Sequence, residues 1–238
     1  LALMETLADY GAASYFGLQT FTTSIYRAWF SLGDRLAASQ LAAGYQFEFI
    51  YGDITDWEST RKAFEMAREQ FGAVDVLVNN AGITRDASFR KITPEDWNAV
   101  INTNLNGMFN TTKQVIEGML SKGWGRVINI SSINGQRGQF GQTNYSAAKA
   151  GIHGFTMALA REVSGKGVTV NTVSPGYIQT SMTAAIRQDI LDTMIAATPV
   201  GRLGQPEEIA SIVAWLASDE SGYSTGADFS VNGGMNMQ

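Results

Sequence analysis

Four short runs rich in apolar and β-branched residues alternate with segments of helical character between about residue 45 and the end of the chain. These runs cover 74–78, 126–130, 168–173 and 227–231. Their length and composition predict buried strands. Strands that are separated by helices pair in parallel and leave helices on both faces of the sheet. The pattern therefore predicts an α/β fold with a single doubly wound parallel sheet.

Helix signals lie between the predicted strands. A capping box at 55–58 predicts a helix that continues to about residue 71, and the proline in Thr93-Pro94 favours the first helical position. A third helix is expected over 144–163. A fourth begins at Pro206 and carries one apolar face, formed by Ile209, Ile212, Val213 and Leu216. No linker or repeat divides the sequence, so we expect one domain over 1–238.

Residues 1–44 do not continue this pattern. The stretch 16–30 mixes aromatic, Thr and Ser residues without a clear period, although 36–43 has helical character. Further along, 182–197 has the pattern of a helix, and its position after the last turn motif predicts that it covers the substrate.

The composition narrows the function classes. The 238 residues are 45% apolar and 16% charged, which is a globular composition, and no run reaches the ~18 apolar residues of a membrane span. A net charge of −5 argues against nucleic acid as the main partner. Glu5 and Asp9 interrupt the apolar start of the chain, so we expect no signal peptide and a cytoplasmic protein.

The chain has no cysteine and one histidine, His153. Disulfides, iron–sulfur clusters, thiolate zinc sites and histidine clusters are therefore excluded, and we expect no metal. His153 follows Lys149 on the predicted third helix, where a packing or interface role is the simpler interpretation.

Candidate chemistry follows the strands. In open parallel sheets ligands bind beyond the carboxyl ends of the strands. The segments there are 79–82 (Asn-Asn-Ala-Gly), Ser131-Ser132 and 174–177 (Ser-Pro-Gly-Tyr). Each taken alone is an ordinary strand-to-helix turn.

Tyr145 and Lys149 are four residues apart, which places phenol and ammonium on one face of the third helix. A nearby positive charge lowers the pKa of a phenol from about 10, so Tyr145 becomes a usable proton donor. Ser132 lies 13 residues earlier, across a loop rich in Gly and Gln, and its hydroxyl suits a substrate carbonyl. Hydride must then come from a cofactor, since no side chain supplies one.

Taken together, these residues resemble the short-chain dehydrogenase/reductase family, which has a Rossmann-type sheet. The resemblance runs from about residue 45 to the end and is carried by 79–82, Asn104, Ser132, Tyr145, Lys149 and 174–176. Within the family, the finer motifs at 82–86, 89–91, 138–145 and 224–229 are most similar to the acetoacetyl-CoA reductases. The resemblance implies NADPH-dependent reduction of acetoacetyl-CoA, a short 3-oxoacyl-CoA, to (R)-3-hydroxybutyryl-CoA, as in polyhydroxybutyrate synthesis.

The resemblance also implies roles for single residues. Tyr145 is the general acid, Lys149 lowers its pKa and holds the nicotinamide ribose, Ser132 orients the carbonyl, and Asn104 holds the water of a proton relay. The implied cofactor contacts are Asp53, Ile54, Asn80, Ala81, Gly82, Tyr145, Lys149, Pro175, Gly176 and Ile178. The implied substrate contacts are Asp86, Lys91, Gln139, Phe140, Gln142 and Tyr177. The family usually forms tetramers, so the resemblance implies a homotetramer; Ala147, Ala148, Ala150 and Gly151 with Phe229 fit such contacts.

One departure stands out. The family's Thr-Gly-x-x-x-Gly-x-Gly turn, which receives the pyrophosphate at a helix N-terminus, has no match in 1–44, where Tyr15 takes the place of the middle glycine. Counting back from Asp53 without gaps leaves no room for a first strand. We expect that the biological protein has such a turn and that 1–44 as given misrepresents it. Two alternatives stay open: a 3-oxoacyl-acyl-carrier-protein reductase of fatty acid synthesis, and a catalytically silent member that acts as a binding subunit.

Overall fold

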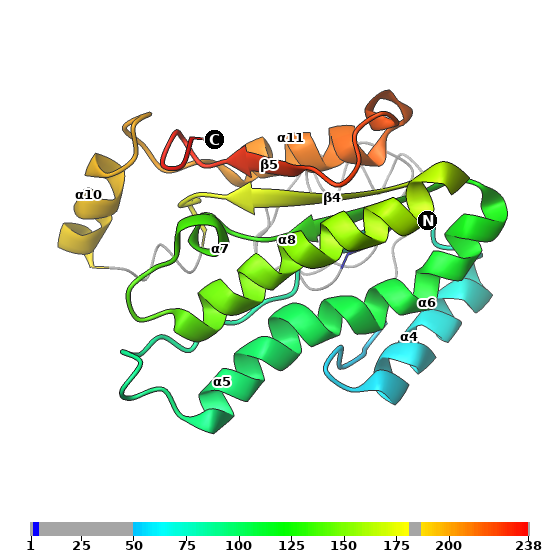
Figure 1. Ribbon diagram of the computed structural model, residues 1–238, viewed down its shortest axis with the longest axis horizontal. Coiled ribbons are helices and arrows are strands. Elements are labelled where there is room, and N and C mark those ends of the chain that lie inside the picture. The colour runs from blue at the N-terminus through cyan, green and yellow to red at the C-terminus, as the bar shows by residue number, and fades with distance from the viewer. Residues whose placement is uncertain (1, 5–49, 181–186, 238) are drawn as a thin grey trace, which may run out of the picture.

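The computed structural model describes residues 2–4, 50–180 and 187–237 (Figure 1). Within these ranges a five-stranded sheet has the order β1-β2-β3-β4-β5, and every neighbouring pair is parallel. The strands are β1 (Ala2–Met4), β2 (Val76–Asn79), β3 (Gly125–Ile130), β4 (Val168–Pro175) and β5 (Asp228–Val231). The predicted parallel sheet is therefore confirmed, with strand ends within two residues of those expected.

Helices cover both faces of the sheet, as predicted. Successive side chains of a strand point to opposite faces, so Val76 and Val78 pack with α11 (Pro206–Ala217) while Leu77 faces the other layer. That second layer consists of α4 (Trp57–Phe71), α6 (Gly107–Lys122) and α8 (Thr143–Val163). In Figure 1, α11 lies above β4 and β5, and α6 and α8 lie below.

Helix ends follow from local chemistry. At α4 the cap is Asp56, whose carboxylate accepts a hydrogen bond from the Ser59 amide; the predicted box, which begins at Thr55, was therefore wrong by one residue. At α5 (Pro94–Ile101) Thr93 caps as expected, accepting from the Asp96 amide. The shorter elements are η1 (Asn102–Asn106), α7 (Ile133–Arg137), η2 (Ser164–Lys166), α10 (Gln188–Ala196) and η3 (Asp219–Ser221).

The start of the chain corrects one prediction. Ala2–Met4 pairs in parallel with Val76–Val78, so the gapless count that left no room for a first strand was wrong. The expected glycine-rich turn and Tyr15 lie outside the described residues, as do Met182 and Ile186 of the predicted substrate-covering helix. Its remainder is α10, in which Met194 and Ile195 are half-buried. Across the described ranges, no helix has the length and apolar content needed to cross a membrane.

Candidate active site

The loop after β2 is fixed by a buried asparagine. Asn104 lies in η1, the π-helical turn between α5 and α6, and only 2% of it is exposed. Its Oδ1 accepts from the Ile83 amide at 2.8 Å, and its Nδ2 donates to the Ile83 carbonyl at 3.0 Å. A side-chain amide that pairs with both groups of one residue mimics a strand partner. Asn104 therefore sets the path of the loop that contains Asn80, Ala81 and Gly82.

The loop after β3 delivers a hydroxyl. Ser132 is the N-cap of α7, and its Oγ accepts from the Asn134 amide at 3.1 Å. The same side chain hydrogen-bonds Tyr145, which lies in the first turn of α8. A hydroxyl that is both a helix cap and a partner of the phenol has little rotational freedom, so Ser132 and Tyr145 are presented together.

Burial dominates the acidity of the phenol. It raises the pKa of Tyr145; the hydrogen bond with Ser132 lowers it, and the nearby negative charge of Asp86 raises it further. Tyr145 is therefore held in its protonated form at neutral pH, the form that a proton donor requires.

Lys149 lies one helical turn after Tyr145 and is buried, with 3% of its surface exposed. Its Nζ donates to the Ile130 carbonyl at the end of β3 at 2.7 Å and lies 5.7 Å from the centre of the Tyr145 ring. Desolvation lowers the pKa of this ammonium to about 8. The expected lowering of the phenol pKa by Lys149 is not seen, because burial outweighs other influences on Tyr145 and the ammonium is directed at a backbone oxygen.

The four predicted catalytic residues converge. A Cβ built on Gly82 would lie 3.5 Å from both Asn104 Oδ1 and Lys149 Nζ, so the β2 loop lies directly against these two side chains. Together with the bond between Ser132 and Tyr145, this contact brings Asn104, Ser132, Tyr145 and Lys149 to one place. We call these four residues the Tyr145 cluster.

Predicted substrate residues divide into a connected pair and an exposed group. Gln142 donates from Nε2 to Asp86 at 2.7 Å and accepts from Asn134 Nδ2 at 2.9 Å. Asn134 was missed by the sequence reasoning, although it lies two residues after Ser132. Lys91, Gln139 and Phe140 are exposed, Phe140 by 90%. The loop after β2 and the loop before α8 meet where the Ala87 amide donates to the Gly141 carbonyl at 2.9 Å.

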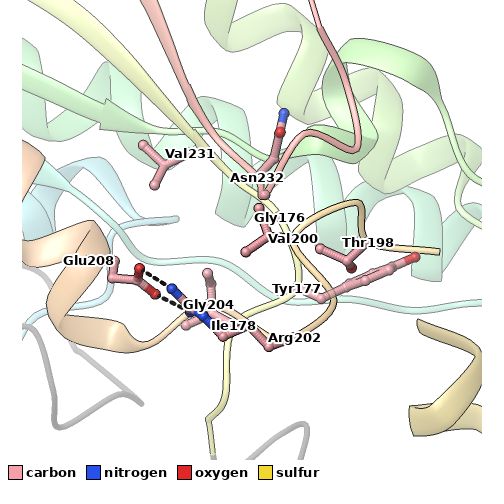
Figure 2. A pocket seen from close by; sticks show the side chains of 11 residues that line it. Gly176, Tyr177, Ile178, Thr198, Val200, Arg202, Gly204, Glu208, Val231 and Asn232 are labelled. Carbon is pink, nitrogen blue, oxygen red and sulfur yellow. Dashed lines mark hydrogen bonds and ion pairs between the residues drawn. The ribbon is translucent and has the colours of Figure 1, made fainter. Parts of the chain in front are cut away.

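A second part of the site lies at the ends of β4 and β5, as Figure 2 shows. Its walls come from Gly176, Tyr177 and Ile178 after β4, from the segment 198–208 and from 231–233 at β5; we call it the β4–β5 pocket. A Cβ on Gly176 would lie 2.7 Å from the Asn232 Cα, so only glycine allows this approach. Pro175 is the last residue of β4, directly before this wall.

Asp53 and Ile54, predicted at the adenine, precede α4. Asp53 Oδ1 accepts from the Thr55 amide at 2.9 Å and from the Thr55 hydroxyl at 2.7 Å, and these bonds lower the pKa of this exposed carboxyl. Ile54 contacts the start of α6, since a Cβ on Gly107 would lie 2.5 Å from its Cδ1. Among the described residues, no contact joins Asp53 or Ile54 to the Tyr145 cluster.

His153 is part of a polar network beside β5, the last strand of the sheet. Its Nε2 lies 3.4 Å from Ser174 Oγ and 3.4 Å from Asp228 Oδ2. Gln136 of α7 donates to the same Asp228 oxygen at 2.8 Å and to Ser230 at 2.5 Å. This network ties α7, whose cap is Ser132, to β5. Within the described ranges no three His, Asp or Glu residues gather in a way that suits a metal ion.

Comparison with known proteins shows which proteins this chain resembles. The family model described as enoyl-(acyl carrier protein) reductase matches residues 28–236. The acetoacetyl-CoA reductase of Cupriavidus necator is 67% identical over 198 residues, which are 83% of this chain and 80% of that protein. The acetoacetyl-CoA reductase of Allochromatium vinosum is 54% identical over 199 residues, 84% and 81% of the two chains.

A relative with a different printed activity is the 3-oxoacyl-[acyl-carrier-protein] reductase of Vibrio harveyi, 50% identical over 185 residues, 78% of this chain and 76% of that protein. The family match spans most of the chain, and these relatives share half or more of its residues over the aligned length. The chain belongs to the short-chain dehydrogenase/reductase family of oxidoreductases, which implies a nicotinamide cofactor.

Proposed function

We propose that this protein is an NADPH-dependent acetoacetyl-CoA reductase that forms (R)-3-hydroxybutyryl-CoA. The observation that carries the proposal is the convergence of Ser132 and Asn104 with Tyr145, whose pKa is raised, beside buried Lys149. A carbonyl oxygen between the two hydroxyls receives a hydrogen bond from Ser132 and the proton from Tyr145. The higher identity to the two acetoacetyl-CoA reductases than to the carrier-protein enzyme supports the CoA substrate.

The residues fit a nicotinamide cofactor where the β2 loop meets α8. Gly82 leaves room in which a Cβ would lie 3.5 Å from Lys149 Nζ, so a ribose can approach the backbone and the ammonium together. When bound, the cofactor supplies the hydride. Lys149 has three N–H donors, of which one goes to the Ile130 carbonyl, and we assign the others to ribose hydroxyls. Pro175, Gly176 and Ile178 would border the nicotinamide, and Asp53 and Ile54 the adenine.

The four residues of the Tyr145 cluster divide the proton chemistry. Tyr145 gives its proton to the developing alkoxide, and Ser132 holds the oxygen in position. Lys149, charged below its pKa of about 8, stabilises the phenolate that remains. Asn104, which holds the Ile83 backbone, places the loop beside Lys149 and would hold the water through which the phenol regains its proton.

Substrate choice is assigned to the rim of the site. Asp86 and Gln142 are bonded to each other, Phe140 lies exposed two residues before Gln142, and Tyr177 lines the β4–β5 pocket. These groups fit a short acyl chain, so we expect four- and five-carbon 3-oxoacyl-CoA substrates to exceed longer ones. Lys91, with Gln139 next to Phe140, would meet the CoA part, and a Lys91→Glu variant should raise the KM for CoA substrates.

The deciding experiment follows NADPH oxidation by the purified protein. Acetoacetyl-CoA, a long-chain 3-oxoacyl-CoA and a 3-oxoacyl carrier-protein thioester are compared at equal concentration, with NADH as a second reductant. We expect the highest kcat/KM with NADPH and acetoacetyl-CoA. Preference for the carrier-protein thioester would establish the alternative of fatty acid synthesis, and no turnover with any of them would favour a silent binding subunit.

Assembly and location form a second part of the proposal. We expect a homotetramer with two-fold axes, formed through α6, α8 and β5. Light scattering at micromolar concentration measures this, and a monomer would contradict it. The cytoplasmic location expected from the sequence stays a prediction that cell fractionation tests.

A further inference from the structure

Resting on the proposed function, we propose that Arg202 and Glu208 are positioning residues that hold the Tyr177–Gln179 segment as a wall of the β4–β5 pocket. They form an ion pair outside the Tyr145 cluster, and both side chains line the pocket (Figure 2). The inference concerns neither a ligand contact nor a catalytic step. It assigns to this pair the shape of the wall against which the substrate and the nicotinamide would lie.

Two backbone hydrogen bonds join the wall to Gly204. The Gly204 amide donates to the Tyr177 carbonyl at 2.9 Å, and the Gln179 amide donates to the Gly204 carbonyl at 2.8 Å. These two bonds form an isolated parallel bridge between Ile178 and Gly204. The position of the Tyr177–Gln179 segment therefore follows the position of Gly204.

Gly204 also packs closely against the wall, where any larger residue would require the Ile178 side chain to shift. A Cβ on Gly204 would lie 2.6 Å from Ile178 Cδ1. In addition, Gln205 donates from Nε2 to Gln179 Oε1 at 2.9 Å. A small displacement of Gly204 and Gln205 would thus move Ile178 and release Gln179.

The ion pair encloses this turn. Arg202 donates from Nη1 and Nη2 to the two carboxylate oxygens of Glu208, at 2.7 Å each, and from Nη1 to the Leu203 carbonyl at 3.0 Å. Glu208 Oε2 also accepts from the Gln205 amide at 2.7 Å, as part of the capping box of α11. Leu203, which precedes Gly204, is therefore bonded to the Arg202 guanidinium, and Gln205, which follows Gly204, is bonded to the Glu208 carboxylate.

An isolated exposed ion pair contributes little to stability, but this pair differs in two respects. Its geometry is bidentate, which fixes direction as well as distance. It also joins a turn to the first turn of α11, which is anchored in the core through Ala210 and Val213. Bonds from Arg202 and Gln205 keep the Glu208 carboxylate charged, with a pKa of about 2, so the ion pair persists at neutral pH.

The test compares Arg202→Met and Glu208→Gln with Glu207→Gln. The control removes the same charge from the same helical turn, and the Glu207 group that bonds Ser211 is its backbone oxygen. Hydrogen–deuterium exchange of the protein without ligands reports the amides of Gln179 and Gly204. We expect exchange at least about tenfold faster in both pair variants and unchanged exchange in the control. If Arg202→Met does not fold, Arg202→Lys replaces it, since one ammonium cannot make the bidentate pair.

Kinetics provide the second measurement. Displacement of the wall should raise the KM for acetoacetyl-CoA and the dissociation constant of NADPH by on the order of tenfold, at an unchanged fraction of active sites. A role in stability alone would lower the active fraction and the melting temperature and leave both constants unchanged, which would overturn the inference. Wild-type exchange rates in both pair variants would overturn it too. A wild-type protein that does not reduce acetoacetyl-CoA would refute the proposed function. The exchange data would still show whether Arg202 and Glu208 hold the Tyr177–Gln179 segment.

Discussion

The Tyr145 cluster and the β4–β5 pocket both lie at the carboxyl ends of the strands, yet they are built differently. In the cluster, side chains from regular elements meet: Asn104 from η1, and Tyr145 and Lys149 from α8. In the pocket, turns meet turns, and the bonds that join them are mostly backbone bonds around Gly176 and Gly204. Groups that transfer a proton are held by helices that pack on the sheet, and the surface that accommodates ligands is held by close-fitting turns.

This difference predicts which substitutions affect rate and which affect binding or folding. Changes at Tyr145 and Lys149 should mainly alter chemistry, whereas Asn104 and Ser132 also bond backbone amides, so their truncation should displace a loop as well. Changes in the pocket should alter ligand constants and stability together, because the contacts that define it are made by the backbone.

The largest effect is expected for Tyr145→Phe. This variant removes the proton donor and keeps the ring, so kcat for acetoacetyl-CoA reduction should fall on the order of 10³-fold. Tyr177→Phe, which removes a hydroxyl from the pocket wall, is the matched control and should remain within a few-fold of wild type. A kcat for Tyr145→Phe within tenfold of wild type would remove Tyr145 from the mechanism.

Lys149 should give the next largest effect and a pH signature. Lys149→Ala should lower kcat/KM about 10²-fold and weaken NADPH binding, since one ammonium has both roles. Because burial lowers the pKa of Lys149 to about 8, the charged form is lost as pH rises through 8, while Tyr145, whose pKa is raised, stays protonated. Wild-type kcat/KM should therefore be flat below about pH 8 and fall above it.

The pH profile of the variant provides the check. Lys149→Ala should lack the ionisation near 8, leaving a low and level profile. The same decline above pH 8 in wild type and variant would assign the titration to another group.

In the pocket, Gly176→Ala should act on stability. The added Cβ would meet the Asn232 Cα at 2.7 Å, a backbone contact that cannot yield without displacing β5. We expect the free energy of unfolding to fall by about 1–3 kcal/mol, measured by urea titration. Gly118→Ala is the control: it lies in α6 with no atom within 4 Å of the new Cβ, and should stabilise by up to about 1 kcal/mol. Equal stability of the two variants would show that the pocket backbone is adaptable.

The smallest effect is expected at the rim. Phe140 is 90% exposed, so Phe140→Ala should leave folding unchanged and raise the KM for acetoacetyl-CoA about fivefold, within what burial of one ring contributes. Phe89→Ala, which truncates a ring that is 74% exposed on the neighbouring loop, serves as control and should leave the KM unchanged. Equal KM values in the two variants would remove Phe140 from the substrate contacts.

The sequence predicts the site where the chemistry follows regular periods. The ends of β2, β3 and β4 are evident from buried apolar runs, and the spacing of Tyr145 and Lys149 shows that they share a helical face. Thr55 and Asp56 illustrate the limit at a helix start: both residue types cap helices, and the path of the preceding chain decides between them. A sequence pattern alone does not distinguish between two such adjacent capping residues.

Other parts depend on contacts between distant residues. Gln136 meets Asp228 across 92 positions, and Arg202 closes on Glu208 only because a glycine-containing turn brings them together. The acidity of Tyr145 was predicted in the wrong direction for a related reason. The sequence shows the neighbouring charge of Lys149 but not the depth to which the fold buries the phenol.

The π-helical turn at Asn102–Asn106 has a consequence for how this site can vary. It adds one residue to an otherwise continuous helical rod that runs from Pro94 to Lys122, so the two flanking helices are out of phase by about 100°. Substitutions can change what stands at position 104 but not the direction in which it points. Only an insertion or a deletion between α5 and α6 would rotate one helix relative to the other. The orientation of Asn104 is therefore set by the number of residues in this segment.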